Sequence, residues 1–188
     1  MSHSSKLFVV LMLELALSQP VMAGGLPVAL VQKGCEQMNR GNYSSAIATF
    51  TTAVKQNPSD LDARRQLCNA YLGAGMAREA AQQLELIAKV SPGNINDLIA
   101  LGEAYVQLGD NRAAISKYKQ AWVLDSTNGR AVIGLARTLM ANGDADSARS
   151  VCAGALRSSK DAVLRSQCSE ILSTISTRSY VVKTAANS

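Results

Sequence analysis

The fold is decided by residues 41–60, GNYSSAIATFTTAVKQNPSD, because their pattern returns along the chain at a fixed interval. The chain reads GMAREAAQQLELIAKVSPGN at 75–94, GDNRAAISKYKQAWVLDSTN at 109–128 and GDADSARSVCAGALRSSKDA at 143–162. Each stretch opens with Gly, has Ala five residues later, and begins 34 residues after the previous one. Four Gly and four Ala at one spacing indicate an internal repeat, and this period is typical of stacked helical units.

Counting from Pro27 gives each unit an internal register. The units then occupy 27–60, 61–94, 95–128 and 129–160. Apolar residues recur at helical spacing, as Leu98, Leu101 and Tyr105 show. The Gly at position 15 is suited to the left-handed turn that ends a helix, and Pro58 ends the second helix of its unit. We therefore expect helix pairs at 27–40 and 43–56, 61–74 and 77–90, 95–108 and 111–124, and 129–142 and 145–158.

Positions 8 and 24 of the repeat indicate how the two helices of a unit pack. Position 8 is small in every copy: Gly34, Cys68, Gly102 and Ala136. Position 24 holds Phe50, Leu84, Tyr118 and Cys152. A small residue on one helix lets its partner approach closely, so we expect the position-24 side chain to fill the space beside position 8.

These residues give the chain a family resemblance. The third copy, with Leu98-x-x-Leu101-Gly102-x-x-Tyr105 and then Ala114-x-x-x-Tyr118, resembles a tetratricopeptide repeat (TPR) of the exported bacterial type. The resemblance implies an all-α, right-handed α-solenoid of about four helix–turn–helix units. An apolar stripe that includes Leu164, Cys168 and Ile175 predicts a capping helix at 161–178, followed by a disordered tail at 179–188.

The resemblance also implies a concave groove that binds a segment of another protein. The groove positions of the family fall here on Asp62, Arg65, Asn69, Ile99, Glu103, Val106, Arg130, Ile133 and Arg137. Arginines with apolar residues between them suit a partner that carries carboxylates and aliphatic anchors. The family's clamp for C-terminal carboxylates is matched at Arg65, Asn69 and Arg130, and is not matched at Ala100 and Gly134.

Residues 1–23 have the pattern of an export signal. Lys6 precedes an apolar run from Leu7 to Leu17, and the small residues Val21 and Ala23 fit a cleavage site. The run is shorter than the roughly 20 apolar residues of a membrane-spanning helix. We expect cleavage, a periplasmic or secreted protein, and no stable membrane span afterwards. An uncleaved segment, giving a cytoplasmic or membrane-anchored protein, is the alternative.

Four cysteines follow this segment: Cys35, Cys68, Cys152 and Cys168. None forms a C-x-x-C motif. In an oxidising compartment, the repeat register makes Cys152–Cys168 and Cys35–Cys68 possible disulfides. The alternative is that each cysteine fills a small buried space as an inert apolar residue.

The composition limits the classes of function. The only histidine is His3, within the segment expected to be removed, so no histidine-based catalytic triad forms in the mature chain. We find neither a phosphate-binding loop nor the alternation of basic and aromatic residues that nucleic-acid binding requires. We expect a scaffold without enzymatic activity, cofactor or metal, binding another protein within an envelope, pilus or secretion assembly. The alternatives are a cytosolic chaperone-type adaptor with an uncleaved N-terminus and a self-assembling homo-oligomer.

Overall fold

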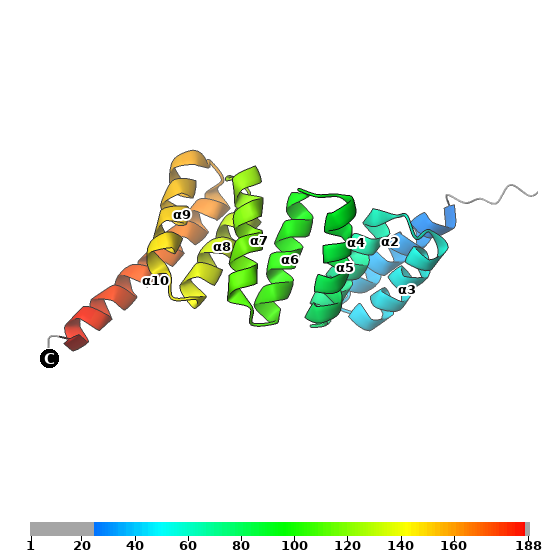
Figure 1. Cartoon of the computed structure of the whole chain (residues 1–188), viewed down its shortest axis with the longest axis horizontal. Helices are drawn as coiled ribbons and strands as arrows, with labels where there is room; N and C mark the ends of the chain where they lie inside the picture. Colours follow the sequence, from blue (N-terminus) through cyan, green and yellow to red (C-terminus); the bar gives the residue numbers. More distant parts are fainter. Residues whose placement is uncertain (1–24, 187–188) are drawn as a thin grey trace, which may run out of the picture.

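A computed structural model describes residues 25–186 of the chain and the side chains of residues 28–177. The predicted export segment lies outside the described residues. The described residues form helices and no strand (Figure 1). The helices are α2 (Gly25–Asn39), α3 (Tyr43–Gln56), α4 (Leu61–Gly73), α5 (Ala77–Val90), α6 (Ile95–Gln107), α7 (Asn111–Leu124), α8 (Gly129–Ala141), α9 (Ala145–Ser158) and α10 (Ala162–Ala186).

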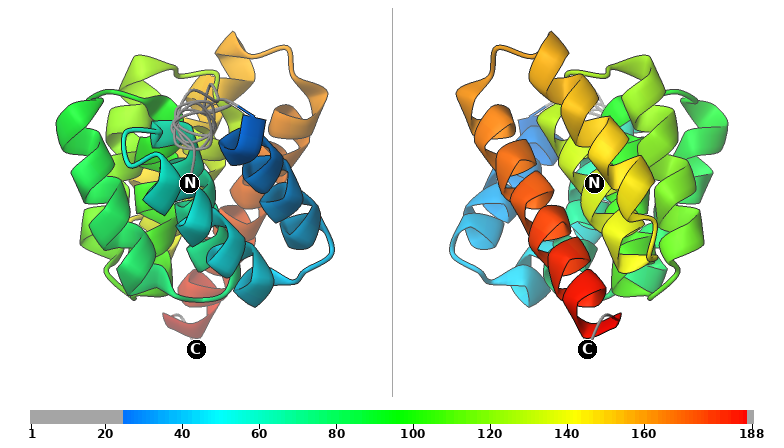
Figure 2. Two further views of the ribbon diagram at one scale, coloured as in Figure 1. Left: turned by 90° about the vertical axis from the view of Figure 1, so that its right-hand side faces the viewer. Right: turned by 90° about the vertical axis from the view of Figure 1, so that its left-hand side faces the viewer.

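The helices stack as an α-solenoid, as the sequence predicts. Helices α2/α3, α4/α5, α6/α7 and α8/α9 form the four pairs, and each of the eight helices begins and ends within two residues of its expected bounds. Consecutive helices pack together, and each first helix also contacts the first helix of the next unit. Within residues 25–186, no two second helices make such a contact. The first helices α2, α4, α6 and α8 therefore form the inner layer of the array. Figure 2 views the array from its two ends.

The repeated Gly at position 15 supplies the turn inside each unit. Gly41 has a φ of 75° and Gly109 a φ of 78°, in the left-handed region. A Cβ atom added to either residue would meet nothing within 4 Å. The backbone conformation, and not a lack of space, therefore requires glycine at these turns.

A second feature sets the boundary between units. The residue before each new first helix is Asp60, Asn94 or Asn128, and each side chain accepts a hydrogen bond from a backbone N–H of that helix. Asp161 accepts from the backbone N–H of Val163 at 2.8 Å and so caps α10 in the same way. These caps satisfy N–H groups that have no partner within the helix.

The packing expected between positions 8 and 24 is confirmed. A Cβ atom on Gly34 would lie 2.5 Å from the ring of Phe50, and one on Gly102 would lie 2.8 Å from the ring of Tyr118. Gly134 of the next unit faces the same Tyr118 ring, with a Cβ distance of 2.5 Å. Tyr118 is therefore held between two first helices, α6 and α8.

Helix α10 closes the array against α8 and α9. Leu164, Cys168, Ile171 and Ile175 are buried, which confirms the predicted apolar stripe. The predicted tail at 179–188 is wrong as far as Ala186, because α10 continues to that residue and projects beyond the other helices (Figure 1). The segment contains neither Gly nor Pro, so nothing in its sequence stops the helix.

Candidate functional site

Five of the nine predicted groove residues line one cavity of about 340 Å³ on the inner layer. They come from α6 and α8, and α10 adds Gln167 to the wall. The lining residues are Glu103, Val106, Tyr118, Gly129, Arg130, Ile133, Gly134, Arg137, Thr138 and Gln167. The C-terminal half of the array thus has a preformed hollow where the sequence predicts partner contacts.

The charges of this cavity differ in their availability. The Nη2 atom of Arg130 donates to Oε1 of Glu103 at 2.8 Å, and the two side chains are 61% and 38% exposed. An ion pair so exposed to water is weak and exchanges readily. Arg137 is exposed and forms no ion pair with any residue that the structure describes. A carboxylate from outside can therefore bind Arg137 without displacing an internal partner.

Two residues of the cavity lining, Tyr118 and Thr138, carry hydroxyl groups. Tyr118 is 4% exposed, and its burial, together with the negative charge of Glu103, raises the pKa of its phenol. Tyr118 therefore stays neutral near pH 7 and offers no nucleophile. The Oγ1 atom of Thr138 donates to the backbone carbonyl of Gly134 at 2.7 Å, so this hydroxyl already has an acceptor. The charged and apolar side chains of the lining are the groups that can contact a ligand here.

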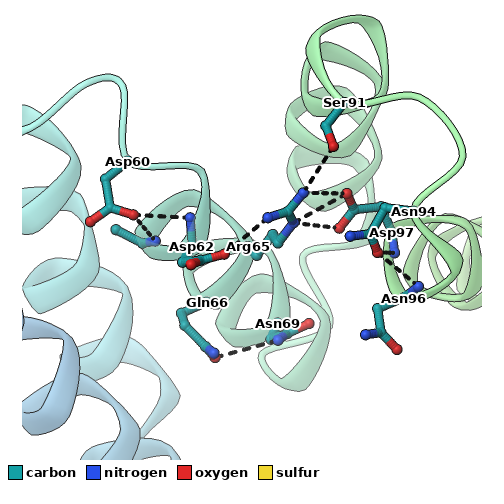
Figure 3. Close-up of polar contacts among 10 residues, drawn as sticks. Asp60, Asp62, Arg65, Gln66, Asn69, Ser91, Asn94, Asn96 and Asp97 are labelled. Carbon is teal, nitrogen blue, oxygen red and sulfur yellow. Dashed lines mark hydrogen bonds and ion pairs between the residues drawn. The ribbon is translucent and has the colours of Figure 1, made fainter.

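The N-terminal part of the predicted groove is different, because Arg65 is engaged inside the protein (Figure 3). Its Nε atom lies 2.9 Å from Oδ1 of Asp97, and its Nη2 atom lies 3.0 Å from Oδ2 of the same carboxylate. Its Nη1 atom donates to Oδ1 of Asp62 at 2.9 Å. These contacts raise the pKa of Arg65, chiefly through its hydrogen bonds to Asp97, and keep it charged. The prediction that Arg65 contacts a partner stays a prediction, and in this structure its guanidinium is already paired with carboxylates of the protein itself.

Two other predicted groove residues in this part of the array, Ile99 and Asn69, differ in their exposure to solvent. Ile99 is 0% exposed and belongs to the core, so its assignment to the groove is wrong. Asn69 is exposed and donates to Gln66 at 3.4 Å. With Arg65 engaged and position 100 filled by a buried alanine, the carboxylate clamp of the family does not form here.

Sequence reasoning missed Asp97, Tyr118 and Gln167. A signal for Asp97 existed, because the other units have alanine at its position 3: Ala29, Ala63 and Ala131. Tyr118 was expected only as a core residue, and it is buried while also lining the cavity. Gln167 had no signal, because the packing angle of the capping helix decides which of its polar residues faces the cavity.

The four cysteines are free thiols in this structure. Cys152 and Cys168 are both 0% exposed and lie in the same core cluster, where burial raises the pKa of each thiol. Cys68 is also fully buried, and burial raises its pKa to about 12. Cys35 is partly exposed and packs against a different cluster of the core from Cys68.

Neither a metal site nor a membrane span is found in the part of the chain that the structure describes. Among residues 25–186, no three His, Cys, Asp or Glu side chains gather as metal ligands would. No helix within that range combines the length and the apolar character needed to cross a bilayer.

Comparison with known proteins adds a family and several relatives. The sequence model of a family described as "Tetratricopeptide repeat" matches residues 38–104 and 105–167. Cellulose synthase operon protein C of Pseudomonas fluorescens is 31% identical over 145 residues, which cover 71% of this chain and 11% of that protein. Cytochrome c-type biogenesis protein CcmH of Escherichia coli is 28% identical over 120 residues, which cover 64% of this chain and 34% of that protein. The chain thus spans about a tenth to a third of these relatives.

A solved structure supports the fold independently. A thermophilic TPR protein from Thermus thermophilus aligns with a TM-score of 0.67 at 22% sequence identity. The alignment covers 79% of this chain and 82% of that one. At this level of identity, the likeness establishes a shared architecture.

Proposed function

Because the chain belongs to the tetratricopeptide repeat family, whose fold supports protein–protein interaction, we propose that it binds a segment of a partner protein along its inner layer. The binding site is the cavity between α6, α8 and α10. The observation that carries the proposal is the convergence there of five predicted groove residues around Arg137, which has no carboxylate partner in the described residues.

The lining of the cavity indicates the chemistry of the partner segment. Arg137 accommodates a carboxylate of an aspartate, a glutamate or a chain terminus. Val106 and Ile133 offer apolar contact for an aliphatic side chain beside that carboxylate. We therefore propose a segment that combines one acidic group with one aliphatic anchor. In this arrangement Arg137 alone would bind the acidic group, whereas the family's clamp uses several basic residues.

The proposed setting is outside the cytoplasm, in an envelope, pilus or secretion assembly. The support is the sequence of residues 1–23, with Lys6, the apolar run Leu7–Leu17 and the small residues Val21 and Ala23. Mass spectrometry of the protein isolated from its own cell tests this part. A chain that begins at Gly24 supports export, whereas a chain that retains residues 1–23 in the cytoplasm contradicts it.

Site-specific photo-crosslinking in the native cell tests the binding site. The probe replaces Val106 or Arg137 in the cavity, and a control probe replaces Gln82, an exposed residue of α5 on the outer layer. We expect the cavity probes to capture one protein that the control probe does not capture. Capture of only a second copy of this chain contradicts the proposal and indicates a self-assembling array.

A matched pair of substitutions identifies the charged contact. With the probe at Val106, Arg137→Glu should lower capture at least tenfold by placing two negative charges together. Arg112→Glu makes the same change on the outer helix α7, where the arginine is also exposed and forms no ion pair with a described residue. Equal capture by the two variants contradicts the role of Arg137.

A further inference from the structure

Cys152 and Cys168 contact each other where the last repeat meets the capping helix. Cys152 comes from α9 and Cys168 from α10, and both belong to the core cluster that also contains Leu164 and Ile171. Helices α9 and α10 pack against each other, the two thiols lie close enough to affect each other's pKa, and neither residue is exposed. Two thiols in such contact are placed for a bond between their sulfur atoms, provided that an oxidant reaches them.

We propose that Cys152 and Cys168 form a disulfide that joins α10 to the last repeat, and that this bond closes while the chain folds. The oxidant is a disulfide, either a small molecule such as glutathione disulfide or a disulfide-donating protein. One cysteine loses its thiol proton and, as a thiolate, attacks the donor disulfide. The sulfur that leaves the donor takes up that proton. The second cysteine then displaces the donor's other sulfur. The chain loses two hydrogens, and the donor becomes two thiols.

The timing follows from burial. A disulfide donor must reach a sulfur atom along the S–S axis, and neither sulfur in the folded chain is open to solvent. Burial and the neighbouring Cys168 thiol also raise the pKa of Cys152 to about 12, so the attacking thiolate is scarce near pH 7. The exchange therefore proceeds before α10 docks, or after α10 separates from α9.

The structure distinguishes this pair from the other two cysteines. Cys68 is buried in the core cluster formed by α4, α5 and α6, whereas Cys35 packs against the core cluster formed by α3 and α4. We expect Cys35 and Cys68 to remain thiols in the folded protein.

The bond also has a consequence for the binding site, which rests on the proposed function. Gln167 lines the cavity and directly precedes Cys168 in α10. A bond at Cys168 fixes this wall of the cavity relative to α8 and α9. The mapping experiment below does not depend on partner binding, so the disulfide can be confirmed even if the cavity binds nothing.

Peptide mapping after oxidative refolding tests the proposal. Trypsin places the four cysteines in four different peptides, which are residues 34–40, 66–78, 150–157 and 166–178. The full chain is unfolded with reductant, refolded with glutathione disulfide and glutathione, treated with N-ethylmaleimide and digested without reduction. We expect peptide 150–157 linked to 166–178, with peptides 34–40 and 66–78 carrying the label. Four labelled cysteines, or a mixture of pairings, would overturn the proposal.

Two kinds of variant serve as controls. Cys35→Ala/Cys68→Ala should form the same linked peptides, because it leaves the contacting pair intact. Cys152→Ala should leave Cys168 as a labelled thiol, and circular dichroism checks that the helices remain. A new bond from Cys168 to Cys35 or Cys68 in that variant would contradict the assigned pairing.

Two measurements separate a folding-time bond from later oxidation. The folded, reduced chain, treated with the same glutathione disulfide, should form the linked peptides at least ten times more slowly than the refolding chain. Equal rates would contradict the proposed timing. The linked protein should also melt about 5–10 °C above the reduced protein, because the bond lowers the conformational entropy of the unfolded chain. Identical melting would show that the bond does not stabilise the docking of α10.

Discussion

Arg65 of α4 donates hydrogen bonds from two nitrogen atoms to the carboxylate of Asp97 of α6, and this ion pair joins the second unit to the third. The side chains are 22% and 5% exposed, so the carboxylate is largely removed from water. The Nη2 atom of Arg65 also lies 3.5 Å from Oγ of Ser91 (Figure 3). Other units fill these positions with Ala and with apolar residues such as Val31 and Ile133. At these two positions the boundary thus has an ion pair, whereas the corresponding residues of the other units are apolar.

Breaking this pair on one side should be costly. Arg65→Ala leaves the Asp97 carboxylate buried without its partner, so we expect the free energy of unfolding to fall by about 3–5 kcal/mol. The double variant Arg65→Ile/Asp97→Ala restores the residue types of the fourth unit and should lose at most about 1 kcal/mol. Urea titrations of the three proteins measure these differences. A double variant as unstable as Arg65→Ala would show that apolar residues cannot replace the pair here.

The contact between Gly102 and Tyr118 predicts a strong effect of one added methyl group. In Gly102→Ala the new Cβ would lie 2.8 Å from the phenol ring, and the ring cannot move away because Gly134 faces it from α8. We expect a loss of about 1–3 kcal/mol in the free energy of unfolding. Gly154→Ala in α9 is the matched control, since nothing lies within 4 Å of its added Cβ. It should gain about 0.5–1 kcal/mol from helix propensity, and a loss there would contradict the packing argument.

Leu101 tests the register of the repeat. It is 1% exposed in α6, so Leu101→Ala should lower the free energy of unfolding by about 2–5 kcal/mol. Leu86→Ala in α5 removes the same atoms from a side chain that is 48% exposed, and should cost much less. Thermal melts of both variants compare the two positions directly. Equal shifts would mean that Leu101 does not lie in the core.

Because the Cys68 thiol is buried, we expect the protein to lose stability in alkali under reducing conditions. Burial raises the pKa of its thiol from 9.0 to about 12 in the folded chain. Above pH 9 the unfolded chain therefore releases a proton that the folded chain retains, and this favours unfolding. The contribution of the Cys68 thiol to the free energy of unfolding is fully present below pH 9 and is lost as the pH rises toward 12. Between pH 8 and pH 10 we expect about 1 kcal/mol of lost stability that Cys68→Ala does not show.

The sequence predicts the helices well because their ends depend on local chemistry. Gly41 and Gly109 adopt the left-handed backbone conformation at turns that favour glycine. The regular spacing of such glycines along the chain indicates where the helices begin and end. The partners of long side chains are harder to predict, because they depend on how one unit rotates against the next. Arg65 illustrates this limit, since its approach to Asp97 crosses 32 residues of chain. Ile99 shows the same limit, because a small rotation of α6 decides whether position 5 faces the core or the groove.

The pattern of helix contacts has a consequence for how quickly the chain folds. Among residues 25–186, every contact between helices joins elements that are neighbours or next-but-one neighbours in the sequence. Such a chain has a low contact order, and little loop entropy is lost before native contacts form. Helical proteins of this kind fold within microseconds to milliseconds. An additional unit of 34 residues needs only the two neighbours it touches, so the array can grow in length without a new search for its topology.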